Sequence, residues 1–212
     1  MNSTRFALVV AAVIGVNVTS PNTARSQATT HYDGQWWRSV SADERGGFVD
    51  GYIDCYVYEY KGPAGFSDHS ASALVRLIDE YYSKHLSDLR ESVPSTLSRF
   101  RDRPGDTPAA NAEGGEVHFE PHGYFDGTYW KGMSDSGRVG FVEGYVSCHA
   151  DQSRNAGGVF KESPTAYRDL VSRWYGLNVE TGGINAVREH EKVADVLYRV
   201  RSGSPASSGG RD

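Results

Sequence analysis

The chain has 212 residues, 38% hydrophobic and 12% aromatic, so it can bury a core, and this composition excludes disorder throughout. Its formal net charge is −5 and its basic residues are scattered along the chain. Because binding to phosphates depends on clustered Lys and Arg, this pattern disfavours a nucleic-acid or anionic-membrane partner.

Residues 1–28 have the layout of a secretory signal peptide. Arg5 precedes an apolar run from Phe6 to Val16, and small residues follow at two candidate cleavage points, after Ser26 and after Ala28. The run is shorter than the roughly 20 residues that a membrane-spanning helix needs. We therefore expect an exported protein, periplasmic or secreted, with no membrane span after processing and a mature net charge of −7.

A nine-residue stretch occurs twice, as GFVDGYIDC from Gly47 to Cys55 and as GFVEGYVSC from Gly140 to Cys148. At a constant offset of 93 the match also includes residues before and after this stretch, and it resumes near the end of each copy after a shift of seven. The pattern predicts an internal duplication, with repeat 1 at residues 29–103 and repeat 2 at residues 125–201. Residues 104–124 have a linker composition, and residues 202–212 are expected to be a disordered tail.

Each repeat is predicted to be a three-helix unit, and the fold class is all-α. The first helix begins after Ser41, with Glu44 completing a capping box, and ends near Lys61. The second helices have one apolar face at helical spacing, formed by Leu74, Leu77, Ile78, Tyr81, Tyr82 and His85, and by Tyr167, Leu170, Val171, Trp174 and Tyr175 after Pro164. The third helix of repeat 1 begins near Pro94, and Leu97 and Phe100 are expected to face the core. In repeat 2 the expected core-facing residues are Val187, Val193, Leu197 and Val200. Sustained alternation typical of strands is absent from the sequence.

Small residues form a stripe on each first helix, because Gly47, Gly51 and Cys55 recur every four positions, as do Gly140, Gly144 and Cys148. Glycine inside a helix costs about 0.5–1 kcal/mol relative to alanine, so close packing against a partner helix is the expected compensation. The simplest partner is the other repeat, related by a pseudo-twofold axis, with Cys55 and Cys148 joined as a disulfide. The alternatives are two buried free thiols, or glycines that make room for Trp37 and Trp130 of their own repeats.

Arg45 and Arg138 are expected to be partly buried, and Asp33 and Asp126 are their predicted structural ion-pair partners. A functional alternative is an anion or carboxylate-ligand site at the arginines.

Asp50 and Glu143 are paired by the repeat, and an exposed helix edge is the expected position of both; the alternative is a pair of catalytic carboxylates. Cys148 and His149 are sequence neighbours, which do not face each other on a helix. The seven histidines show no metal-ligand spacing. We accordingly predict no catalytic residue, no cofactor and no metal.

Aromatic residues are the candidate binding residues, because Tyr and Trp are enriched at binding surfaces. They are Trp36, Tyr56, Tyr58, Tyr60 and Tyr129. The three tyrosines from Tyr56 to Tyr60 cannot all point inward from one helix, so at least one is expected to be exposed.

With GYI and GYV on a first helix, a tyrosine-rich second helix and a short third helix near a proline, each copy resembles the small exported helical immunity proteins that neutralise type VI secreted amidase toxins. The resemblance implies an exported non-catalytic module that binds a protein partner in the cell envelope. The alternative function is an envelope enzyme that acts on peptidoglycan or a sugar polymer with Asp50 or Glu143 as acid or base.

Overall fold

The computed structural model describes residues 32–60, 66, 69–101, 125–153, 159–177 and 186–201. The chain divides into two units, residues 1–30 and 31–212, and all of these described residues belong to the second. The expected signal peptide, the linker at 104–124 and the tail at 202–212 lie outside the described residues.

Every regular element in the described residues is helical, which confirms the all-α prediction. Residues 32–101, called the first half, contain α1 (Gly34–Ser39), α2 (Ala42–Tyr60), α3 (Ala71–Lys84), the 3₁₀ turn η1 (Leu86–Asp88) and α4 (Val93–Arg101). Residues 125–201, called the second half, contain α5 (Gly127–Gly132), α6 (Asp135–Gln152), α7 (Pro164–Trp174), α8 (Ala186–Glu189) and α9 (Val193–Val200).

The short helices α1 and α5 were not predicted, so a three-helix unit is too simple a description. Each begins at an Asp-Gly pair whose aspartate caps the helix, since Asp33 accepts hydrogen bonds from two backbone N–H groups and Asp126 does the same. A helix of six residues is too short to show an apolar period, so the capping aspartate is its main sequence signal.

The predicted starts of the longer helices are confirmed. Ser41 Oγ accepts from the backbone N–H of Glu44 at 3.1 Å at the start of α2, and Pro164 occupies the first turn of α7. The third helix of the second half differs from expectation, because it is divided into α8 and α9. Val193, Leu197 and Val200 nevertheless face the core as predicted.

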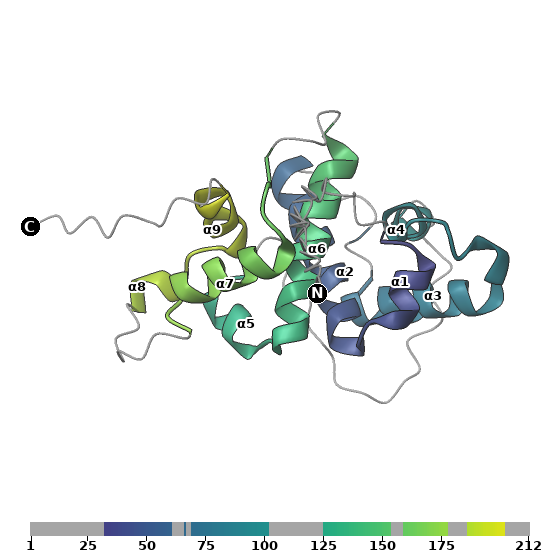
Figure 1. Cartoon of the computed structure of the whole chain (residues 1–212), viewed down its shortest axis with the longest axis horizontal. Helices are drawn as coiled ribbons and strands as arrows, with labels where there is room; N and C mark the ends of the chain where they lie inside the picture. Colours follow the sequence, from purple (N-terminus) through teal and green to yellow (C-terminus); the bar gives the residue numbers. More distant parts are fainter. Residues whose placement is uncertain are drawn as a thin grey trace, which may run out of the picture. The chain divides into compact units, whose positions relative to one another are not determined.

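The core is built around α2 and α6, which lie side by side at the centre of Figure 1. The same view shows α1, α3 and α4 on one side of this pair, and α5, α7, α8 and α9 on the other. The two central helices run parallel, because Glu44, Phe48 and Cys55 of α2 meet positions successively further along α6. Trp37 and Trp130 are fully buried beside them.

Glycine permits the close approach of α2 and α6. A Cβ on Gly51 would overlap the backbone of Phe141, and one on Gly144 would overlap the backbone of Phe48. Gly140 and Glu44 make the same kind of contact. These contacts are reciprocal at the offset of 93, and they confirm that the glycine stripes accommodate the opposite helix. The alternative, in which the glycines make room for tryptophans of their own repeats, is wrong.

Cys55 and Cys148 form the predicted disulfide, with their Cα atoms 6.1 Å apart, so the free-thiol alternative is wrong. Two tyrosines at equivalent positions add hydrogen bonds between the helices. Tyr52 donates to Asp151 Oδ2 at 3.1 Å, and Tyr145 donates to Glu59 Oε1 at 3.4 Å. Backbone contacts at the glycines, the disulfide and the two tyrosine hydrogen bonds thus all join the halves where α2 meets α6.

Candidate functional site

The predicted pair between Asp33 and Arg45 is wrong. Arg45 instead binds Asp79 Oδ1 at 2.7 Å, and the same oxygen accepts from Trp37 Nε1 at 2.7 Å. Asp33 is engaged at the start of α1, where Oδ1 accepts from the backbone N–H groups of residues 35 and 36. Asp79 lies on α3, so one carboxylate joins three helices.

The predicted pair between Asp126 and Arg138 is wrong for the same reason, since Asp126 Oδ1 caps α5. Arg138 donates to the carbonyl oxygens of Trp130 and Lys131 at the end of α5, at 2.8 Å and 3.1 Å, and forms an ion pair with Asp135 at 2.9 Å. These donors bind groups of the chain itself, so the structure favours the structural interpretation of both arginines over a ligand site.

Asp50 and Asp54 lie one helical turn apart on α2 and face the second half. Tyr129, on α5, donates a hydrogen bond to Asp50 Oδ2. Asp54 is only 2% exposed, and its Oδ2 atom has no hydrogen-bond partner among the described residues. Burial raises the pKa of each carboxyl to about 7. The prediction that Asp50 lies at an exposed helix edge is wrong, because its side chain is half-buried and bound by Tyr129. Sequence reasoning did not single out Asp54.

Glu143 on α6 is the repeat equivalent of Asp50. It is 8% exposed, so the prediction that it lies at an exposed helix edge is also wrong. Burial, together with the negative charge of Glu44, raises the pKa of Glu143 to about 8. Its Oε2 atom has no hydrogen-bond partner in the described part of the chain.

Asp50 and Glu143, which the sequence offered as an alternative pair of catalytic carboxylates, have different neighbours. Tyr129 contacts Asp50, whereas the neighbouring charge that acts on Glu143 is that of Glu44. A pocket of ≈ 640 Å³, open to solvent, is lined by Asp126, Thr128, Tyr129, Gly132 and Met133. Tyr129, which donates to Asp50, is therefore a wall of this pocket.

The candidate binding aromatics are not gathered in one place. Trp36 packs on Tyr32 and Phe48 of its own half, with ring centroids 4.9 and 5.0 Å away. Tyr129 lies at the pocket. The side chain of Tyr58 is outside the described residues. Tyr56 and Tyr60 lie together at the carboxyl end of α2, 6.2 Å apart, and Tyr60 is 38% exposed, which confirms the expected exposed tyrosine.

Further aromatic and cationic side chains join Tyr56 and Tyr60 at this end of the central helices. Arg101 stacks over Tyr56 at 5.2 Å and donates to its hydroxyl at 3.0 Å. Arg201 stacks over Tyr198 at 4.9 Å, and the ring of His149 is 6.3 Å from Tyr198. We call this surface the aromatic end; its members are Tyr56, Tyr60, Arg101, His149, Tyr198 and Arg201.

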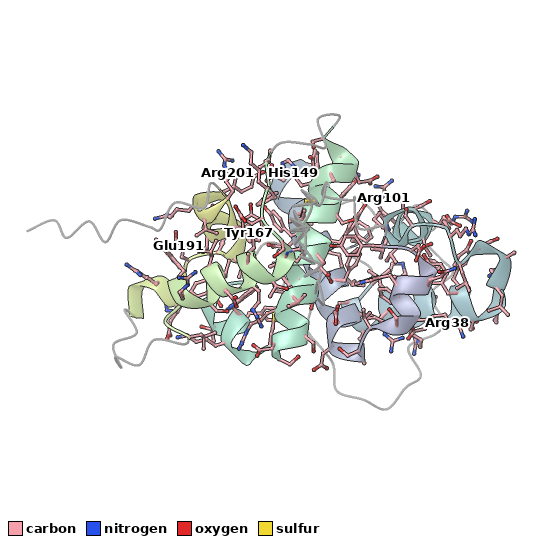
Figure 2. All side chains as sticks on the ribbon, viewed as in Figure 1. Arg38, Arg101, His149, Tyr167, Glu191 and Arg201 are labelled. Carbon is pink, nitrogen blue, oxygen red and sulfur yellow. A yellow bond between two sulfur atoms is a disulfide. The ribbon has the colours of Figure 1, made fainter. Side chains whose placement is uncertain are left out.

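Electrostatic links connect the two parts of the aromatic end. Burial raises the pKa of Tyr198. The hydrogen bond that Tyr198 donates to Glu59, together with the charges of Glu59 and Tyr60, raises that pKa further. Burial and the positive charge of Arg201 lower the pKa of His149. Figure 2 shows Arg101, His149 and Arg201 at the same end of the described helices. Sequence reasoning found Tyr56 and Tyr60 but not Tyr198 or the arginines, because those residues lie at the ends of helices that are distant in the sequence.

Within the described residues no group of three or more His, Cys, Asp or Glu side chains is arranged to hold a metal ion. Among the same residues, no helix combines the length and apolar character needed to cross a membrane. In comparisons with known proteins, no family model, curated protein or solved structure matches the chain.

Proposed function

We propose that this chain is an exported, disulfide-linked tandem duplication that acts as a non-catalytic protein-binding module of the cell envelope. The observation that carries the proposal is the aromatic end, where tyrosines and arginines stack on one another and Tyr60 remains exposed. Tyr, Trp and Arg dominate the binding energy of protein interfaces, because they combine a large apolar area with polar tips.

The residues that recur between the two copies support a non-catalytic assignment, because the contacts they make are structural. The glycines form the helix contact, the cysteines form the disulfide, and the aspartates cap α1 and α5. The reciprocal contacts between α2 and α6 are those that a pseudo-twofold duplication produces. Export is supported by the disulfide, since such bonds persist in oxidising compartments.

The partner class follows from the resemblance of each copy to exported immunity proteins, and it is an envelope-directed amidase toxin or a similar secreted protein. The test is a pull-down from periplasmic extract with the purified processed protein, followed by titration of the captured protein by calorimetry. We expect a saturable complex of fixed stoichiometry that is weakened at least about tenfold by Tyr60→Ala with Arg201→Ala, the effect of losing 1.4 kcal/mol.

Leu86→Ala is the matched control, because Leu86 is an exposed hydrophobic residue outside the aromatic end. This variant should bind like the wild type. Binding that is unchanged in the aromatic-end variant, or no saturable complex at all, would contradict the proposal.

A second candidate function is an envelope enzyme with Asp50 or Glu143 as acid or base. The observation that favours it is that pKa values of about 7 for Asp50 and about 8 for Glu143 lie near neutral pH, as a general acid or base requires. The test is release of soluble fragments from peptidoglycan by wild type, Asp50→Asn and Glu143→Gln. Activity lost in a variant that unfolds at the wild-type temperature or above would favour the enzyme over the binding module.

A further inference from the structure

The pocket beside α5 has the size and the opening of a ligand site. It is lined by residues of α5 together with Asp126 and Met133, which cap the two ends of this helix. Its volume of ≈ 640 Å³ lies within the range of about 300–1,000 Å³ that is typical of small-molecule sites. Because the pocket is open to solvent, a ligand bound there can also extend beyond it.

The residues of α5 that line the pocket are smaller than their counterparts in the first copy. At the offset of 93, the counterparts of Thr128, Tyr129 and Gly132 are a glutamine, a tryptophan and a serine. A Cβ on Gly132 would meet no atom within 4 Å, so the space beside this residue is open. The Asp-Gly pair and the buried tryptophan that fix the short helix are the same in both copies, so the two copies differ at the lining and agree in the support.

Tyr129 gives the pocket an aromatic wall that is already held in place. Its hydroxyl donates to Asp50, and its ring packs on Phe125 with the ring centroids 4.4 Å apart. Ordering a free side chain opposes binding, and this cost is small for a ring that is fixed at both ends. The remaining surface of the ring can pack against the apolar face of a ligand.

The polar groups of the lining are acceptors and hydroxyls, and none of the five lining residues is basic. Oδ1 of Asp126 accepts from two backbone N–H groups, whereas Oδ2 lies 3.7 Å from Nδ1 of the exposed His190, beyond hydrogen-bond distance. Thr128 adds an exposed hydroxyl group. A matching ligand therefore supplies hydroxyl or N–H donors together with an apolar ring face.

We propose that this pocket is a saccharide-binding site, in which a pyranose ring packs on Tyr129 and donates hydroxyl hydrogen bonds to Oδ2 of Asp126. A pyranose has C–H groups on its faces and hydroxyl groups around its edge, which is the combination that these residues match. An acetamido sugar fits best, because its N–H adds a donor and its methyl group adds an apolar contact for Met133. The site is additional to the protein-binding surface at the aromatic end and shares no residue with it.

Titration of the processed, oxidised protein with N,N′,N″-triacetylchitotriose, followed by NMR, tests the proposal. We expect saturable shifts of the backbone signals of Thr128 and Gly132. Gly132→Phe fills the open space without meeting the chain, and it should weaken binding at least about tenfold. Asp126→Asn retains an oxygen for the helix cap and should weaken binding at least about threefold, because hydrogen bonds to a charged acceptor are stronger than those to an amide.

Ser39→Phe is the matched control, because Ser39 is the exposed repeat equivalent of Gly132 on α1, and it should bind the trisaccharide like the wild type. The variant Tyr60→Ala with Arg201→Ala should also bind it normally, which separates this site from the proposed protein-binding surface. Absence of saturable shifts at α5, or unchanged binding in Gly132→Phe or Asp126→Asn, would overturn the proposal. So would a trialanine peptide that binds the pocket as tightly as the trisaccharide does.

Discussion

At the residue scale, buried carboxyl groups set how the stability of this protein depends on pH. Glu143 illustrates the effect, because it is buried on α6 near Glu44 and its pKa is raised to about 8 from an ordinary value of 4.5. The folded protein therefore retains a proton that the unfolded chain loses. The resulting contribution to stability is complete below about pH 4.5 and is lost as the pH rises toward 8.

Glu143→Gln removes the ionisation while keeping the shape of the side chain. We expect the variant to match the wild type near pH 4 and to be more stable at pH 8.5 by on the order of 2–4 kcal/mol, since each pKa unit corresponds to 1.36 kcal/mol. Urea unfolding of both proteins at the two pH values measures the difference. An equal stability difference at both pH values would show that the carboxyl is not shifted.

Asp79 is the second residue whose role can be measured separately, because its Oδ1 atom accepts from both Trp37 and Arg45. Asp79→Ala leaves a buried indole N–H without an acceptor and should destabilise the protein by about 1–3 kcal/mol. Asp79→Asn retains an acceptor oxygen and should recover more than half of that loss in thermal unfolding. Equal losses in the two variants would indicate that packing, and not the hydrogen bond, accounts for the effect.

At the element scale, the pairing of α2 with α6 depends on the absence of side chains. Both helices have low amphipathicity, since they are buried on several sides, and small residues determine which faces meet. The carbonyl groups of Phe48 and Phe141 occupy the space that a Cβ on Gly144 or Gly51 would need. No side-chain rearrangement relieves a contact between backbones.

Gly51→Ala should therefore destabilise the protein by at least about 3 kcal/mol, at the upper end of the range for overpacked cores, because the helices must separate. Gly46→Ala is the matched control on the same helix, since a Cβ there meets nothing within 4 Å. It should stabilise the protein by about 0.5–1 kcal/mol through helix propensity. Chemical unfolding measures both, and similar effects at the two positions would refute the close contact.

The sequence predicted the elements whose residue pattern lies within a single helix. The stripe of Gly47, Gly51 and Cys55 predicted the helix pairing and the disulfide, because small residues at helical spacing need a partner backbone. The helices α1 and α5 were missed because they are too short for an apolar period. Pairings across elements, such as Arg45 with Asp79, were missed because no local pattern records which helix will lie opposite.

The candidate site was less predictable than the fold for a related reason. Asp50 and Glu143 flank the glycine stripe, and from one helix alone a flank appears exposed. Asp50 is contacted by Tyr129 of α5, and Glu143 lies near Glu44 of α2, and both environments are consequences of the packing between the halves. The aromatic end likewise combines residues from the ends of four helices.

At the scale of the whole molecule, the disulfide contributes through the unfolded chain. It joins residues 93 positions apart, and closing a loop of that length is worth about 4–5 kcal/mol in the chain-entropy model. The native halves have other contacts, including the glycine crossing and the hydrogen bonds of Tyr52 and Tyr145. Folding and covalent linkage are therefore separable.

The double variant Cys55→Ala with Cys148→Ala should retain the native circular dichroism spectrum while losing about 4–5 kcal/mol of unfolding free energy. A reducing agent should lower the stability of the wild type toward that of the variant and leave the variant unchanged, which distinguishes loss of the cross-link from loss of side-chain packing. Unfolding in urea with and without reductant measures all four states. If the reduced wild type were as stable as the oxidised protein, the disulfide would have no role in stabilising the assembled halves. If the variant had no helical signal, the contacts between α2 and α6 would be insufficient for folding without the disulfide.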